Sequence, residues 1–135
     1  MDMRAISVKW SPYLLATLRI VTALLLLEHG TQKLLGFPAS ANPSLALMSL
    51  LGLQGCLELI GSLLLVSGAF TRAAAFVLSG DMAAAYFMAH LPKSIFPVLN
   101  GGDAAILFCF IFLYLAVAGG GACAVDNLRR KTDMP

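Results

Sequence analysis

The chain has 135 residues, of which 59% are hydrophobic and only 12% are charged, and its formal net charge is +2. A soluble domain averages about 25% charged residues, so this composition excludes an ordinary soluble protein. It predicts one integral membrane domain over residues 1–135. The chain has no basic patch with interleaved aromatic residues, which argues against nucleic acid as a partner and leaves the lipid bilayer.

Two apolar stretches in the first half of the chain have the length of membrane helices. The first covers about residues 13–35, and Pro12 suits the start of a helix. The second covers about residues 45–70 and follows Pro43 and Ser44, which suit a helix opening.

Two more such stretches follow. The third covers about residues 72–91 and stops before Pro92, while the fourth covers about residues 102–119. Asn100 is the expected N-cap of the fourth, and the glycines at 119–121 are its expected stop. The predicted fold is therefore all-α, a four-helix transmembrane bundle.

Positive charge predicts how this bundle is oriented. The side with both termini carries six basic residues, namely Arg4, Lys9, Arg72, Arg129, Arg130 and Lys131. Only Lys33 and Lys93 fall on the opposite side. The positive-inside rule then places both termini in the cytoplasm, which predicts a multi-pass protein of the bacterial inner membrane.

Three charged residues lie inside the predicted spans, where a charge is costly and usually pairs or lines a cavity. Arg19, Asp81 and Glu58 are expected roughly 10, 13 and 18 Å from the cytoplasmic ends of their helices. At such similar depths, one cation and two carboxylates are able to meet. This predicts a site that binds a polar headgroup or moves a proton, and the alternative is an ion-pair network that fixes helix packing.

A second polar cluster is predicted at the other surface, at the ends of three spans. It comprises Glu28, His29, Lys33, His90, Lys93 and Asp103. Two of these charges have a structural explanation. Lys33 can snorkel to the headgroups, and Asp103 can stabilise the N-terminus of a helix. No metal-ligand spacing connects the two histidines, so a metal site is not predicted.

The rotation of the first span separates its polar residues. At 100° per residue, Arg19, Leu26, Gly30 and Lys33 share one face, while Glu28 points nearly opposite. Glu28 is therefore expected to face another helix or another subunit.

Several ordered motifs resemble the DoxX family of small bacterial membrane proteins. The first is Arg19-x10-Gly30-x2-Lys33-Leu34-x-Gly36-Phe37. It is followed by Glu58-x2-Gly61, Gly68-x2-Thr71-Arg72, Asp81-Met82-x2-Ala85 with His90, Asn100-Gly101-Gly102-Asp103, and Gly119-Gly120-Gly121 with Val125-Asp126. The chain departs from the family pattern near the ends of its fourth helix. Asp103 replaces the commoner glutamate, Gly120 replaces a proline, and Ala124-Val125-Asp126 stands for Ser-Leu-Asp.

The resemblance implies a four-helix inner-membrane oxidoreductase subunit, related to the membrane subunit of a thiosulfate:quinone oxidoreductase. The sequence has no haem, flavin or iron–sulfur motif, and its three cysteines form no C-x-x-C pair. Any electron carrier is therefore expected to be a bound quinone or the cofactor of a redox partner protein.

On this hypothesis Arg19 orients a quinone carbonyl, and Glu58 and Asp81 exchange protons as catalytic residues. The substrate-binding set is His29, Lys33, His90 and Asp103. One alternative is a scaffold or assembly subunit that holds a partner or forms a homo-oligomer through small-residue helix faces. Another is a small proton-coupled transporter.

Overall fold

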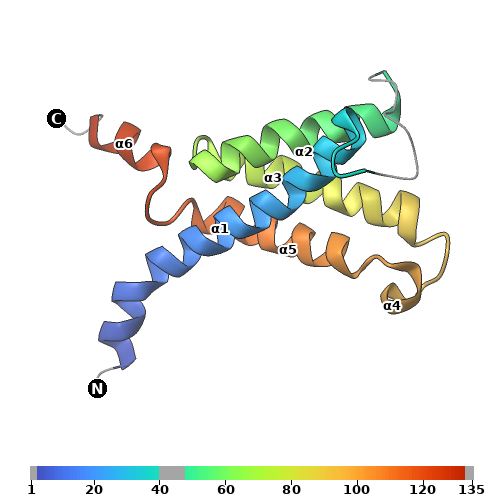
Figure 1. Ribbon diagram of the computed structural model, residues 1–135. Helices are drawn as coiled ribbons and strands as arrows, with labels where there is room; N and C mark the ends of the chain where they lie inside the picture. Colours follow the sequence, from blue (N-terminus) through green and yellow to red (C-terminus); the bar gives the residue numbers. More distant parts are fainter. Residues whose placement is uncertain (1–2, 40–47, 133–135) are drawn as a thin grey trace.

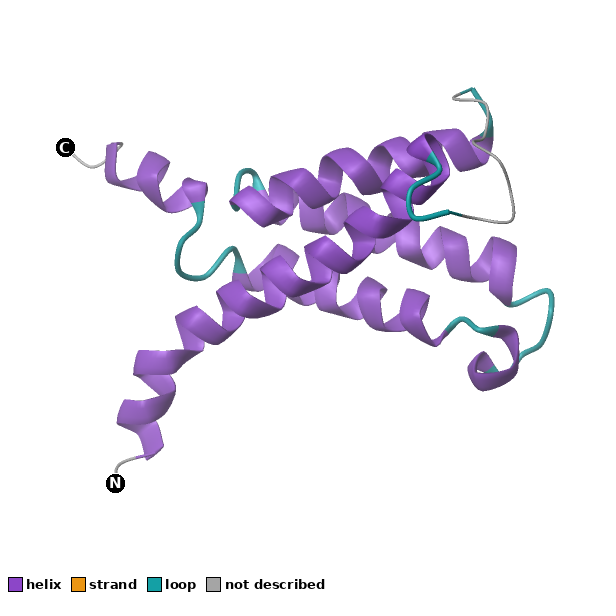
Figure 2. Cartoon of the chain, viewed as in Figure 1, coloured by secondary structure: helices purple, strands orange, loops and turns teal. Residues whose placement is uncertain are grey.

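The computed structural model describes residues 3–39 and 48–132, which form helices and turns and contain no strand (Figures 1 and 2). In chain order the helices are α1 (Met3–Leu35), α2 (Leu50–Ser67), α3 (Thr71–Ala85), the π-helix η1 (Tyr86–His90), α4 (Pro97–Asn100), α5 (Asp103–Ala118) and α6 (Val125–Thr132). The all-α prediction is confirmed.

Four long elements make up the bundle. Helix α1 packs against α2, α2 against α3, and α3, which continues into η1, packs against α5 (Figure 1). The N- and C-termini lie at one end, here called the terminal end, whereas α4 and the C-terminus of α1 lie at the opposite, distal end. The two termini thus share one end of the bundle, as the predicted even number of passes requires.

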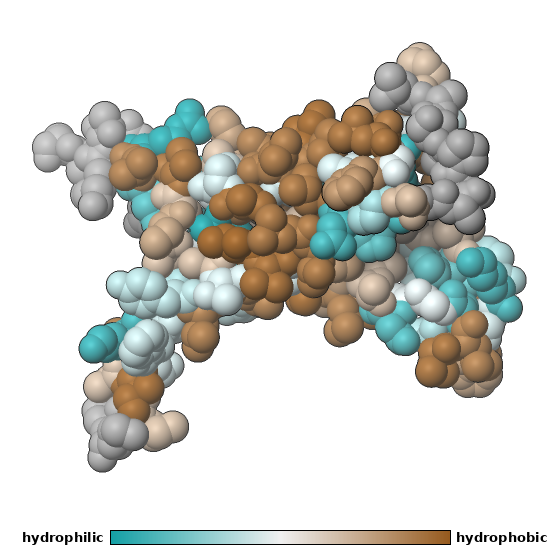
Figure 3. All heavy atoms as spheres, in the orientation of Figure 1, coloured by the Kyte–Doolittle hydropathy of each residue, from teal (hydrophilic) through white to brown (hydrophobic). Residues whose placement is uncertain are grey.

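Many large apolar side chains are exposed on the described part of the chain, among them Leu24, Leu53, Val77 and Phe110. Figure 3 shows apolar residues over the centre of the face in view and hydrophilic residues towards both ends. Helices α1 and α2 are long and apolar enough to cross a membrane, and α5 is a shorter apolar helix of 16 residues. Crossing of the bilayer by all four elements stays a prediction.

Helix α1 begins earlier than the sequence suggested. Pro12 lies inside α1 instead of at its start, so the predicted boundary near residue 13 is wrong. A proline within a helix removes one backbone N–H and bends the chain, and Figure 1 shows α1 bending in its N-terminal part. The carbonyl of Pro12 accepts a hydrogen bond from the N–H of Ala122, which ties α1 to the C-terminal segment.

Helix α2 is shorter than predicted at both ends. It begins at Leu50, with Ser49 as N-cap accepting a hydrogen bond from the N–H of Gly52. The predicted opening at Pro43 and Ser44 lies outside the described residues. The helix ends at Ser67 because Gly68 adopts a left-handed conformation (φ 71°), the usual C-cap geometry.

The later helices agree more closely with the sequence. Helices α3 and η1 together replace the predicted span 72–91, and α5 ends at Gly119 as expected. Asn100, however, is not the N-cap of α5. It ends the short helix α4, and its side-chain oxygen accepts a hydrogen bond from the N–H of Gly102. Helices α4 and α6 were not predicted, because their 4 and 8 residues are shorter than the stretch of about 11–18 residues over which helical periodicity is recognised.

The predicted inward face of α1 is confirmed. Arg19, Leu26 and Gly30 are buried, Lys33 is half-buried, and Glu28 is exposed on the opposite side. Leu26 belongs to the apolar core of the bundle, which comprises Ala23, Leu26, Leu65, Ala74, Ala75, Leu78, Met82, Phe112 and Leu115.

Helices α1 and α2 approach each other closely at Gly30. A Cβ atom there would lie 2.7 Å from the backbone nitrogen of Leu59, so Gly30→Ala must push the two helices apart. We expect this variant to lower stability by about 1–3 kcal/mol, the usual cost of overpacking. The matched control is Gly80→Ala in α3, where the added methyl meets open space. Thermal unfolding in detergent should show a lower midpoint for Gly30→Ala alone, and equal midpoints would contradict the close contact.

Candidate functional site

A pocket of about 320 Å³ lies at the distal end of the bundle, between α1, α2, η1 and the start of α5. Most of its wall is apolar, and four of its lining side chains, His29, Lys33, Glu58 and His90, are ionisable. Such a pocket, apolar with a few convergent polar groups, is the usual form of a small-molecule site. The wall residues are Leu26, His29, Lys33, Leu51, Gln54, Glu58, Met82, Ala85, Ala89, His90, Gly101, Ala104, Ala105 and Phe108.

The central feature of this pocket is an ion pair between two helices. Lys33 Nζ, in the last turn of α1, lies 2.6 Å from Glu58 Oε1 in α2. The Glu58 side chain is only 2% exposed and that of Lys33 is 21% exposed. Gly30 lies one turn before Lys33, and its contact with the α2 backbone brings the lysine within reach of the carboxylate. Lys33 therefore does more than snorkel to the headgroups.

The second oxygen of Glu58 has no hydrogen-bond partner among the residues that the structure describes, although it is fully buried. Buried polar atoms are nearly always paired, so an unpaired one indicates a missing water or ligand. Oε2 of Glu58 thus marks a position where a hydrogen-bond donor would bind.

Asp81 in α3 lies beside this ion pair. It is close enough to interact electrostatically with Glu58 and Lys33, and the Gln54 amide hydrogen-bonds to it. Its Oδ2 atom is also buried without a partner in the described part of the chain. Asp81 therefore lies near Glu58, but it is absent from the residues that line the pocket. Gln54 was missed, although its spacing of one helical turn from Glu58 signals a shared face.

The two histidines line different walls of the pocket. His90 Nδ1 lies 3.0 Å from the carbonyl oxygen of Asn100, and its ring stacks on Tyr86. His29 contacts Phe108 edge to face from α1. The structure therefore brings His29, Lys33 and His90 of the predicted substrate-binding set to one pocket.

Asp103 is the exception in that set. It is exposed in the first turn of α5 and is absent from the residues that line the pocket. There its negative charge interacts favourably with the N-terminal end of the α5 dipole, which is the alternative role that the sequence suggested for Asp103.

Arg19 occupies a different site, at the terminal end. Its fully buried guanidinium donates to five carbonyls: those of Leu65 and Val66 near the end of α2, and those of Gly120, Ala122 and Cys123 after α5. The prediction that Arg19 meets Glu58 and Asp81 is wrong. Leu65 lies two helical turns beyond Glu58, roughly 10 Å along α2.

The cation that meets Glu58 is therefore Lys33. Arg19 acts as a clamp that holds the end of α2 to the segment after α5. The last carbonyls of a helix have no partner within the helix, and the carbonyls of the segment after α5 are outside any helix, so both need an external donor. A guanidinium carries five N–H donors in a fixed plane, which suits it to this role better than an ammonium group.

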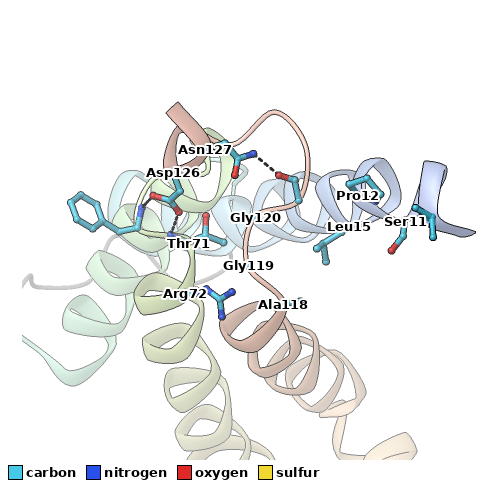
Figure 4. A pocket seen from close by; sticks show the side chains of 13 residues that line it. Ser11, Pro12, Leu15, Thr71, Arg72, Ala118, Gly119, Gly120, Asp126 and Asn127 are labelled. Carbon is cyan, nitrogen blue, oxygen red and sulfur yellow. Dashed lines mark hydrogen bonds between the residues drawn. The ribbon is translucent and has the colours of Figure 1, made fainter. Parts of the chain in front are cut away.

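A larger cavity of about 760 Å³ lies beside this clamp, lined by residues of α1, the start of α3 and the segment after α5 (Figure 4). Three of its polar side chains are engaged by backbone groups. Asp126 accepts from the N–H groups of Phe70 and Thr71, Arg72 donates to the carbonyl of Val117, and Asn127 donates to that of Gly121. The bonds of Asp126 join the C-terminal segment to the start of α3, that of Arg72 joins α3 to the end of α5, and that of Asn127 lies within the C-terminal segment. We therefore assign these three side chains a structural role.

The pKa of Asp126 follows from these contacts. Partial burial acts to raise it, but the hydrogen bonds from Thr71 and Phe70 and the nearby charge of Arg129 together lower it below its ordinary value of 3.8. A carboxylate with a lowered pKa in the folded state stabilises the protein above its ordinary pKa. That contribution is lost as the pH falls through the lowered value.

We therefore expect Asp126→Ala to cost about 1 kcal/mol at pH 7, the usual value of a lost helix cap. The difference from the wild type should shrink as the pH falls below about 4, where the unfolded-state carboxyl takes up its proton. Thermal unfolding of both proteins between pH 7 and pH 3 would measure this difference in stability. A difference that stays constant over this range would show that the charge of Asp126 is not what caps α3.

Comparison with known proteins decides the family. Residues 14–91, more than half of the chain, match the family model described as DoxX. This chain belongs to the DoxX family. A Haemophilus influenzae protein described as an uncharacterized protein is 46% identical over 124 residues, covering 88% of this chain and 92% of its own length. No solved structure matches. The DoxX family is membrane-associated, in agreement with the two long apolar helices.

Proposed function

We propose that this DoxX protein is a quinone-interacting subunit of a membrane oxidoreductase, with the distal pocket as its quinone site. One observation carries the proposal. A buried Lys33–Glu58 ion pair, with a carboxylate oxygen that lacks a partner, forms part of the wall of an otherwise apolar pocket. Buried charges of this kind at membrane depth generally belong to functional sites.

The pocket suits a quinone headgroup in size and chemistry. Its volume of about 320 Å³ is at the lower end of the range for ligand pockets. That favours a single ring, with an apolar tail outside among the helices. Met82 and Phe108 provide apolar contacts for the ring, while Lys33 donates to a ring oxygen and Glu58 and His90 lie at the polar wall.

The ionisable residues would supply the protons that quinone chemistry requires. A bound quinone supplies two-electron redox chemistry, in which each oxygen gains or loses one proton. Glu58 lies at the pocket wall and holds or releases a proton there, and Asp81 behind it is positioned to exchange protons with Glu58. Lys33 balances the charge of Glu58.

The proposed setting is the bacterial inner membrane, with both termini in the cytoplasm. The positive-inside rule and the shared position of the termini support this orientation. The distal pocket then opens on the periplasmic side. Because the sequence has no motif for haem, flavin or an iron–sulfur cluster, a redox partner protein is proposed as the other electron carrier.

Quinone retained during purification tests this function. The protein is purified from membranes in mild detergent, and the extracted small molecules are quantified by mass spectrometry for the wild type, Glu58→Gln and Asp103→Asn. We expect near-stoichiometric quinone in the wild type and in Asp103→Asn, and at least about tenfold less in Glu58→Gln because a buried charged partner is lost. Phospholipid alone in all three samples would refute the quinone site and favour the scaffold alternative.

A further inference from the structure

The His90 ring is held in an orientation that fixes the role of each nitrogen. Its Nδ1 lies 3.0 Å from the carbonyl oxygen of Asn100, and a carbonyl oxygen only accepts hydrogen bonds. Nδ1 therefore carries the proton and donates. In the neutral ring, Nε2 is then left with its lone pair as an acceptor. Stacking on Tyr86, with ring centroids 6.3 Å apart and an interplanar angle of 19°, restricts rotation of the ring.

Glu58 provides a second acceptor in the same pocket, from a different helix. Oε1 is engaged by Lys33 Nζ at 2.6 Å, whereas Oε2 has no partner within residues 3–39 and 48–132. A carboxylate that is paired with an ammonium group has no proton of its own to donate. The open hydrogen-bonding positions of Glu58 and His90 thus both require a donor.

Lys33 does not distinguish a quinone from a hydroquinone. Its ammonium group can donate to a carbonyl oxygen or to a hydroxyl oxygen, because both of these oxygens accept. Discrimination between the two forms of a quinone must therefore come from His90 and Glu58. A quinone carbonyl would direct lone pairs at these acceptors, whereas a hydroquinone hydroxyl donates to them.

We infer that the distal pocket binds the hydroquinone form of its ligand in preference to the quinone form, with His90 Nε2 and Glu58 as the hydroxyl acceptors. This inference rests on the proposed function, since it specifies which redox form that same site recognises. A site built to pair with a hydroxyl rejects an analogue without it, because its buried polar groups are left unpaired. A tenfold preference would raise the two-electron potential of the bound couple by about 30 mV.

The test compares three ligands with one ring and one short side chain: a hydroquinone, its quinone, and its di-O-methyl ether, which has no hydroxyl donors. Dissociation constants are measured anaerobically by equilibrium dialysis for the wild type, His90→Phe and Asp103→Asn. Phenylalanine keeps a ring beside Tyr86 and removes Nε2. Ratios of constants within one sample do not depend on how much of the variant is folded.

We expect the wild type and Asp103→Asn to bind the hydroquinone at least about tenfold more tightly than the quinone or the ether. In His90→Phe this preference should fall several-fold. Equal affinities, or tighter binding of the quinone, would overturn the inference while leaving a quinone site in place. A preference that His90→Phe leaves unchanged would overturn the role of His90. Absence of binding by both redox forms would overturn the inference and the proposed function together.

Discussion

Replacing Arg19 with methionine is expected to destabilise the terminal end of the bundle by about 3 kcal/mol or more. The side chain is fully buried and donates to carbonyl groups of α2 and of the segment after α5. Methionine fills a similar length but donates no hydrogen bond. Four part-buried carbonyls, those of Val66, Gly120, Ala122 and Cys123, would lose this donor at once, whereas the buried carbonyl of Leu65 keeps the N–H of Gly68. Each acceptor left unpaired costs about 1–3 kcal/mol when water cannot reach it.

The matched control for Arg19→Met is Arg72→Met. Arg72 also donates to carbonyls at a helix end, those of Ala116 and Val117 in α5, but it is exposed, so water can replace it. The midpoint of thermal unfolding in detergent and the amount of protein in the membrane should fall strongly for Arg19→Met and little for Arg72→Met. If Arg19→Met were stable and instead lost only its ligand, the clamp would be wrong and the role predicted from the sequence would regain support.

Replacing Lys33 with methionine is expected to have the second large effect, because it leaves the carboxylate of Glu58 buried without its cation. Loss of one partner of a buried ion pair is costly, whereas loss of both is often tolerated. We therefore expect Lys33→Met alone to lower stability and to abolish ligand retention. The double variant Lys33→Met/Glu58→Gln should recover stability but not binding.

A double-mutant cycle measures this coupling. For residues in direct contact we expect an interaction energy of about 1–3 kcal/mol from the unfolding of the wild type, the two single variants and the double variant. Lys93→Met is the control, because Lys93 is an exposed lysine outside the pocket lining at the same end of the bundle. Additive effects of Lys33→Met and Glu58→Gln would contradict the ion pair as the centre of the site.

Some of the candidate site was accessible from the sequence. Charged residues in apolar stretches pointed to Glu58 and Asp81, and helical periodicity placed Lys33 on the inward face of α1. The sequence paired Glu58 with Arg19 instead of Lys33, because the depth of each residue was counted from predicted helix ends. The ends of neighbouring helices are not level: Arg19 lies 16 residues after the start of α1, yet it bonds to Leu65, two residues before the end of α2.

The sequence by itself determined the helical class, the family and the face that α1 turns inward, because these depend on composition, on motif order and on the fixed rotation per residue. Only the tertiary structure decided which charges meet. Arg19 bonds to Gly120, Asp126 caps α3 from 55 residues away, and Asn100 fixes the His90 ring. Such contacts depend on how far each helix is shifted and rotated against its neighbours. That is set by close approaches such as Gly30 on Leu59, which periodicity along one helix does not contain.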